Sequence, residues 1–388
     1  MKKTLQMLRM GALLLMGCLG WYTARASSPP ADTTELVALL HAIDSLASEG
    51  QCQALGPMIA QAQAWGRELG DPWRTRALAS GRMHSKCLRG AGEYRRALTL
   101  ARQHAALLER ELPGSEALMD AWNELGIILF RLSRYDEARA VYERGLALAR
   151  QLFGDESIEV ARFSNNIGLT LGDERAIPYY EQAVRILRHR GDTASMEAVI
   201  FNFNLATTWY NAGELRKAVD GFRSTLRLLE ALPDASPGNI ALVKNNLSVA
   251  LQNLGERDEA MRLLLETRDL YESAFGPDHP QTAYGYSNLG LFFYDEGDYG
   301  RALNYFFKAL AIRRAKMGEQ HELVGNLYNN IGNCYRGLKR YQDALDYCEK
   351  ALAIRLAVLG PDHREVADSY GDLGAIYQEM GLYERALA

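Results

Sequence analysis

The sequence has no excess of positive charge, and this excludes the function classes that depend on one. Lysine and arginine number 44 against 48 aspartate and glutamate residues, a formal net charge of −4. Residues 1–26 contain four basic and no acidic side chains, so the remainder of the chain carries −8. Binding to nucleic-acid phosphates needs a basic surface. We therefore expect no nucleic-acid partner and no attachment to an anionic membrane by charge alone.

Recognisable catalytic and metal-binding motifs are also missing. The sequence contains no H-E-x-x-H, no phosphate-binding loop, no G-x-S-x-G and no dinucleotide-binding glycine pattern. His279, His321 and His363 recur every 42 residues. That interval places them on successive repeats, about 10 Å or more apart, which is too far to share one metal ion. We interpret them as loop and helix-cap residues, and we expect no enzyme activity, metal or cofactor.

Cysteine is sparse, with five residues and no C-x-x-C spacing of the metal-binding kind. Cys18 lies near the N-terminus, which leaves Cys52, Cys87, Cys334 and Cys348 in the body of the chain. An even number of cysteines permits disulfides in an oxidising compartment. We favour the interpretation that these four are small buried residues on helices, and the sequence leaves their disulfide state open.

The N-terminal apolar run, Gly11–Tyr22, is shorter than the roughly 20 residues that span a bilayer. Basic residues precede it and Thr23-Ala24-Arg25-Ala26 follows it, a pattern typical of a secretory signal over residues 1–26. Leu15-Met16-Gly17-Cys18 also resembles a bacterial lipobox, which would end the signal before Cys18 and make Cys18 the lipidated residue. An uncleaved anchor is a third alternative. We expect an exported protein, periplasmic or extracellular, whose only membrane contact is a lipid at Cys18 if that site is used.

The sequence does contain a clear internal repeat. Its landmark is a turn, typically Gly-x-Tyr, followed by an alanine that opens a helix, and the spacing between these alanines is 42 residues from Ala176 onward. Twelve residues before most of them, a small residue follows an aliphatic one, as in Leu289-Gly290 and Ile331-Gly332. The landmark alanines are Ala97, Ala138, Ala176, Ala218, Ala260, Ala302, Ala344 and Ala386. A period of this length predicts a repeat architecture.

The repeat predicts an all-α fold, a right-handed superhelical solenoid of antiparallel helix pairs with the first helices on the concave side. Each pair must stack on its neighbours because a lone pair cannot bury its apolar face. After a linker at 27–33 we expect a degenerate repeat at 34–73 and then the array at 74–388, with its last repeat incomplete. Only eight residues separate Gly168 from Ala176. We therefore expect a shortened hairpin near Leu171–Arg175.

Three segments carry a resemblance to a known family: Asn329-Asn330-Ile331-Gly332, Tyr341-Gln342-Asp343-Ala344-Leu345 and Gly360-Pro361-Asp362-His363. They resemble the 42-residue tetratricopeptide repeats of kinesin light chain and of similar bacterial proteins, over residues 74–388. The resemblance implies a scaffold that binds proteins or peptides. Because the chain stops two residues after Ala386, we expect a longer product. In the alternative, this chain is the recognition or regulatory half of a protein with a C-terminal effector, a CHAT-like protease or a signalling kinase.

The resemblance also implies a binding groove, because peptide ligands of this family lie against the first helix of each pair. Asparagine can hydrogen-bond a peptide backbone of any sequence, and tyrosine adds contact area with a polar tip. The candidate groove residues are Asn123, Asn165, Tyr210, Asn245, Gln252, Tyr284, Tyr294, Asn326, Asn329, Asn333 and Arg336. We expect the asparagines one position later, Asn166, Asn246, Asn288 and Asn330, to join neighbouring helices. The partner, protein or peptide, is not identified by the sequence.

Overall fold

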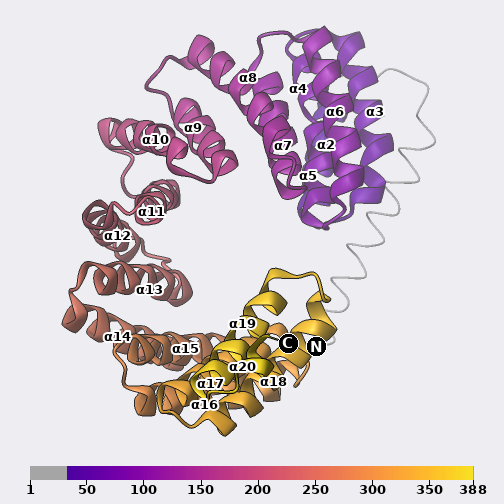
Figure 1. The fold of residues 1–388 in the computed structure, drawn as a ribbon. Coiled ribbons are helices and arrows are strands. Elements are labelled where there is room, and N and C mark those ends of the chain that lie inside the picture. Colours follow the sequence, from indigo (N-terminus) through magenta and orange to yellow (C-terminus); the bar gives the residue numbers. More distant parts are fainter. Residues whose placement is uncertain (1–32, 388) are drawn as a thin grey trace, which may run out of the picture. The chain divides into compact units, whose positions relative to one another are not determined.

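The computed structural model describes residues 33–387, which form helices in consecutive pairs with no β-strand among them (Figure 1). The predicted fold class of stacked helix pairs is confirmed. The predicted leader, including the candidate lipidation residue Cys18, lies outside the described residues. The chain divides between Arg190 and Gly191 into two compact units.

The first unit contains the degenerate N-terminal pair, a broken helix with its partner, and two further pairs. Its elements are α2 (Thr33–Ser48), α3 (Cys52–Leu69), α4 (Trp73–Ala79), α5 (Arg82–Gly90), α6 (Tyr94–Glu111), α7 (Glu116–Arg131), α8 (Tyr135–Phe153), α9 (Ile158–Leu171), the short 3-10 helix η1 (Glu174–Ala176) and α10 (Ile177–Arg190). In the sequential pairs, each helix packs against the next.

The second unit is the regular part of the array, and one apolar cluster spans most of it. Its elements are α11 (Met196–Asn211), α12 (Leu215–Glu230), α13 (Pro237–Leu254), α14 (Arg257–Phe275), α15 (Pro280–Asp295), α16 (Tyr299–Met317), α17 (Glu322–Gly337), α18 (Tyr341–Leu359), α19 (Arg364–Glu379) and α20 (Tyr383–Leu387). One hydrophobic cluster runs from Ala206 on α11 to Ile354 on α18, so successive pairs share their buried surface.

The landmark alanines mark the closest packing within each pair. Ala218, Ala260, Ala302 and Ala344 are each fully buried at the start of a second helix. The small residue on the first helix faces the side chain one turn after the landmark alanine. A Cβ added at Gly290 would lie 2.5 Å from the ring of Phe306, and one at Gly332 would lie 2.4 Å from the sulfur of Cys348. These small residues therefore let the two helices of a pair approach each other.

The turns between pairs follow the predicted pattern. Helix α14 ends at Phe275 and the next residue, Gly276, has φ of 91°, a conformation that favours glycine. Helix α15 starts with Pro280 in its first turn, where a missing N–H costs nothing. His279 caps it by accepting a hydrogen bond from the Gln281 N–H at 3.2 Å. The predicted role of the recurring histidines as cap residues is confirmed.

The shortened hairpin is also confirmed. Helix α9 ends at Leu171, Gly172 takes the left-handed conformation, and the single turn η1 leads into α10. Helices α9 and α10 have 14 residues each, whereas α15 and α16 have 16 and 19. Ala176 is still buried, so the landmark keeps its place although about one helical turn is missing.

One pair of cysteines departs from the favoured interpretation. Cys52, the first residue of α3, forms a disulfide with Cys87 on α5. The interpretation of all four as small buried thiols is therefore wrong for this pair, and it is confirmed for Cys334 and Cys348, which are free and buried. Sequence spacing alone cannot show which helices of the degenerate N-terminal region lie side by side.

Candidate functional site

The first helices of the second unit start in a common register, which lines up equivalent side chains every 42 residues. A side-chain cap fixes each start: Ser195 at α11, Ser236 at α13, and His279, His321 and His363 at α15, α17 and α19. Each cap satisfies an N–H in the first turn that has no helical partner. The caps are 41 to 43 residues apart because α13 starts one residue early, and residues 42 apart occupy the same place on successive repeats.

Two such rows contain exposed apolar side chains, and their polar members are partly exposed. Ile200, Leu242 and Tyr284 belong to the first row and are 44%, 43% and 42% exposed. Seven residues later, the second row contains Val249 and Leu291, which are also exposed. We call these two rows the first-helix face; its members are Ile200, Leu242, Tyr284 and Asn326 in the first row and Thr207, Val249, Leu291 and Asn333 in the second.

The candidate groove residues are distributed over both units. Asn123 on α7 and Asn165 on α9 belong to the first unit, and the other nine lie on α11, α13, α15 and α17 of the second. Asn165 and Asn245 are almost completely buried, at 4% and 7% exposed. Tyr284 is well exposed, and the remaining eight are partly exposed. Whether these residues contact a ligand stays a prediction.

Several of these polar side chains join neighbouring repeats. The Asn166 amide donates to the Asn123 side-chain oxygen at 3.0 Å, and Asn288 makes the same bond to Asn245. This confirms the predicted helix-joining role for Asn166 and Asn288. Asn246 instead donates within its own helix, to the Leu242 carbonyl at 2.8 Å. The asparagine row of the predicted groove is therefore partly occupied by contacts within the protein.

Other candidate residues make similar contacts between repeats. The Gln252 amide donates to the Asp295 carboxylate at 3.1 Å, and the Asn253 amide donates to the Tyr210 hydroxyl at 2.6 Å. Burial raises the pKa of Asp295, and the Gln252 hydrogen bond partly opposes this shift. Burial also raises the pKa of Tyr294. Both groups sit at the ends of the first helices, near the turns.

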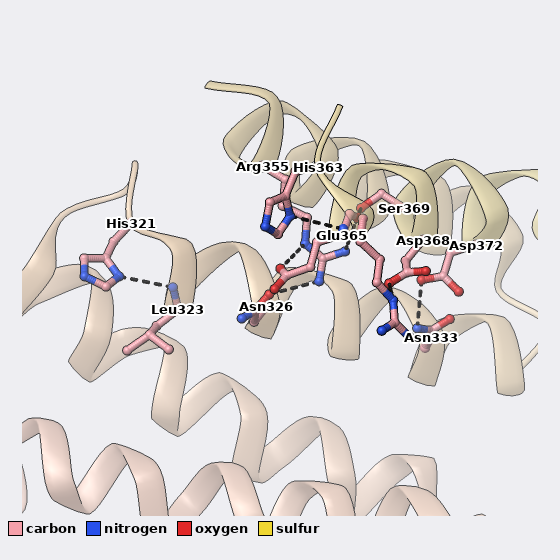
Figure 2. Close-up of polar contacts among 11 residues, drawn as sticks. His321, Leu323, Asn326, Asn333, Arg355, His363, Glu365, Asp368, Ser369 and Asp372 are labelled. Atoms are coloured by element: carbon pink, nitrogen blue, oxygen red, sulfur yellow. Dashed lines mark hydrogen bonds and ion pairs between the residues drawn. The ribbon is translucent and has the colours of Figure 1, made fainter. Parts of the chain in front are cut away.

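Asn326 belongs to a buried polar cluster centred on Arg355 of α18 (Figure 2). The Arg355 guanidinium donates to the Asn326 side-chain oxygen at 2.9 Å, to the Ser369 hydroxyl at 2.7 Å and to the Glu365 carbonyl at 3.1 Å. It also forms an ion pair with the Glu365 carboxylate at 3.3 Å. This arginine is 7% exposed, and its charge is satisfied within the protein.

Arg336 and Asn333 face acidic side chains of the following helix α19. The Arg336 guanidinium forms ion pairs with Asp372 at 3.8 Å and with Glu379 at 3.7 Å. The Asn333 amide donates to Asp372 at 3.5 Å (Figure 2). Asn333 belongs to the first-helix face, and Arg336 lies three residues later on α17. The end of the face next to α19 is therefore more polar than the part formed by α11, α13 and α15.

Within residues 33–387, no three His, Cys, Asp or Glu side chains come close enough to hold a metal ion. No helix in this range is both long and apolar enough to cross a membrane.

Sequence reasoning missed the aliphatic members of the first row of the first-helix face. Ile200 and Leu242 are not among the candidate residues, because the prediction rested on side chains that can hydrogen-bond a peptide backbone. Both lie at multiples of 42 residues before Tyr284, so the period itself contains the signal that would have found them. An exposed apolar row on a helix is informative because such a face would normally be buried.

The helix pairs, their 42-residue register and the face on the first helices of the second unit define a helical-repeat protein. The family model of the tetratricopeptide repeat matches residues 117–189, 239–315 and 323–388. The chain belongs to the tetratricopeptide-repeat family, as the sequence motifs predicted.

Of three matching solved structures, the one with a TM-score above 0.5 supports the same fold. The apo form of RapI is 15% identical, with 91% of this chain and 96% of that chain covered at a TM-score of 0.64. BtubC (BKLC) from P. vanneervenii is 23% identical, with 55% and 86% covered and a TM-score of 0.48. A putative kinesin light chain of Podosopora anserina is 20% identical, with 48% and 88% covered and a TM-score of 0.42. No curated protein matches this sequence.

Proposed function

We propose that the chain binds a protein or peptide partner on the first-helix face of its second unit. Proteins of this family generally mediate protein or peptide binding. The observation that carries the proposal is the pair of exposed rows on α11, α13 and α15, where Leu242, Val249, Tyr284 and Leu291 present apolar surface to solvent. Such a face provides apolar contacts for a partner, and partly exposed amides beside it can fix the register of a bound backbone.

Selection of peptides by the purified protein tests this function. The protein of residues 27–388 would be used to select from a random peptide library, and the recovered peptides titrated against variants. We expect Leu242→Ser and Leu291→Ser together to weaken binding by at least about tenfold, because burial of one such side chain contributes about 1.5–3 kcal/mol. Val358→Ser is the matched control, since Val358 is equally exposed but lies on the second helix α18. Equal affinity of the two variants would contradict the assignment.

We also propose that the protein is exported. The N-terminal pattern predicts this, and the disulfide between Cys52 and Cys87 supports it, because structural disulfides persist in oxidising compartments. Mass spectrometry of the mature protein distinguishes the two forms: cleavage after Ala26 gives a soluble product, and a diacylglycerol mass on Cys18 gives a lipoprotein. An unprocessed Met1 in the mature protein would contradict both.

A further inference from the structure

Two buried arginines occupy the same position on successive repeats but have very different surroundings. Arg313 on α16 and Arg355 on α18 are 42 residues apart and are 5% and 7% exposed. Each lies on the second helix of its pair, beside the start of the next first helix. Their contacts can therefore be compared residue by residue within one chain.

Three polar partners satisfy Arg355, and none of them is repeated at Arg313. The positions of Asn326, Glu365 and Ser369 correspond, 42 residues earlier, to Tyr284, Leu323 and Leu327. The Arg313 guanidinium donates to the Leu323 carbonyl at 3.3 Å, which matches the Arg355 bond to the Glu365 carbonyl. Among the described residues, no carboxylate lies within ion-pair distance of Arg313. Arg313 is thus buried with one hydrogen bond to a backbone carbonyl and no counter-charge.

This arrangement is energetically unusual. A buried charge is costly unless it is paired and hydrogen-bonded, and an arginine remains protonated in proteins. Burial lowers the pKa of Arg313, and the only opposing influence comes from the Tyr284 phenol. The start of α17 lies next to the guanidinium and adds the partial positive charge of a helix N-terminus. The surroundings of Arg313 therefore favour an added anion.

The guanidinium of Arg313 is next to the first-helix face. At the equivalent position, Arg355 reaches the first row of this face directly, because it donates to Asn326. In the repeat of Arg313, Tyr284 takes the place of Asn326 in this row, and Tyr284 is 42% exposed. The Tyr284 phenol also acts on the pKa of Arg313, which it raises. An acceptor that lies on the face beside Tyr284 would replace the oxygen atoms that Asn326 and Glu365 present to Arg355.

We propose that Arg313 binds a carboxylate of the partner that lies on the first-helix face, close to Tyr284. This inference rests on the proposed function and adds to it the chemistry of the partner: an acidic group beside apolar residues that contact Leu242 and Leu291. The carboxylate comes either from an aspartate or glutamate side chain or from the end of a chain. This carboxylate supplies the negative charge that Glu365 supplies to Arg355 and that Leu323, at the equivalent position, cannot supply to Arg313.

Small probes test the carboxylate site without a known partner. The thermal unfolding midpoint of the protein would be measured at constant ionic strength with N-acetyl-aspartate amide, N-acetyl-alanine and the neutral N-acetyl-asparagine amide. The first probe carries a side-chain carboxylate, the second a terminal carboxylate, and the third no carboxylate. We expect one or both carboxylates to raise the midpoint above the neutral probe, and Arg313→Met to abolish the difference. The carboxylate that acts shows which source fits.

The control is the adjacent arginine. Arg314 is half-exposed and already paired with Glu319 at 2.6 Å, so Arg314→Gln should keep the response to the probes. A response of equal size in the wild-type protein and in Arg313→Met, or no response in the wild-type protein, would overturn the proposal.

A second variant keeps the arginine but supplies its missing partners from the chain itself. Tyr284→Asn, Leu323→Glu and Leu327→Ser together copy the surroundings of Arg355. We expect this variant to fold and to lose the response to carboxylates, because Arg313 is then satisfied internally. A response that persists in the folded triple variant would count against the proposal.

Selected peptides separate this inference from the function on which it rests. If acidic peptides are recovered, Arg313→Met should weaken their binding. The loss should be about tenfold or more larger than the loss for the same peptides with Asn or Gln in place of the acid. Peptide binding that needs Leu242 but is unchanged by Arg313→Met would leave the function standing and refute the carboxylate site. If the protein responds to the probes through Arg313 but selects no peptide, the carboxylate site would stand and the proposed peptide binding would be refuted.

Discussion

Asn245 shows that one residue type can be suited to ligand binding and still be used for packing. It lies in the row that the family resemblance assigns to the groove, yet it is 7% exposed and accepts a hydrogen bond from Asn288 of the next repeat. Its side chain therefore links α13 to α15. A residue in this position contributes to stability whether or not a partner also touches it.

A double-mutant cycle measures that link. We expect Asn245→Ala to lower the free energy of unfolding by about 1 kcal/mol, because it leaves the Asn288 amide without its acceptor. Asn288→Ala should have a similar effect, and the double variant should cost clearly less than the sum of the two. Chemical denaturation followed by circular dichroism gives these values. Strictly additive effects would show that the hydrogen bond contributes nothing.

The free thiols of Cys334 and Cys348 give a second prediction for single residues. Burial raises the pKa of each thiol to about 12. The thiolate is the reactive form, so almost none is present at pH 8 in the folded protein. We expect both cysteines to resist iodoacetamide at pH 8 and to react after denaturation, when their pKa values return to the ordinary range. Peptide mass mapping checks this, and rapid labelling of the native protein would contradict it.

Within a helix pair, packing depends on small residues at fixed places, and this part of the fold could be predicted. The spacing from Gly290 to Ala302 predicts a close contact between the two helices, and Ala302 is fully buried. The ring of Phe306 takes up the space that a side chain at Gly290 would need. Short-range periodicity fixes such contacts because both helices of a pair belong to one continuous segment.

Replacement of Gly290 by alanine tests this packing. The added Cβ would lie 2.5 Å from Phe306, so the ring or the helix must move, at a cost of about 1–3 kcal/mol of stability. Gly300→Ala is the matched control, because the nearest atom to its added Cβ is 3.7 Å away and the site is helical. There we expect no loss or a small gain. The thermal unfolding midpoints of the two variants test this expectation, and equal midpoints would refute the packing argument.

Equivalent positions of successive repeats carry different side chains, and the contacts that depend on these differences could not be predicted in the same way. The period assigns Tyr284 and Asn326 to one row, but it does not say that Asn326 satisfies a buried arginine while Tyr284 leaves one unpaired. Likewise, the predicted polar groove residues do not include Leu242, whose exposure is a property of the assembled face. The sequence predicts which residues share a row. The burial of each side chain and its hydrogen-bond partners depend on how three neighbouring helices pack together.

At the scale of the whole molecule, the two units are stabilised in different ways. The second unit has a regular period and a continuous apolar core over residues 206–354. The first contains the degenerate repeat, where α4 and α5 take the place of one long helix, and the disulfide between Cys52 and Cys87 joins α3 to α5. This crosslink spans 35 residues and constrains the region in which the repeat pattern is weakest.

Removal of the disulfide should therefore affect one unit far more than the other. For a loop of this length, the expected loss of stability is about 2–4 kcal/mol, chiefly because the unfolded chain regains its freedom. In the variant Cys52→Ser/Cys87→Ser, hydrogen exchange should become faster in α3 and α5 and remain unchanged in α13–α16. The wild-type protein with a reductant should behave like the variant, and the variant should not respond to the reductant. Uniformly faster exchange along the whole chain would mean instead that the crosslink stabilises both units together.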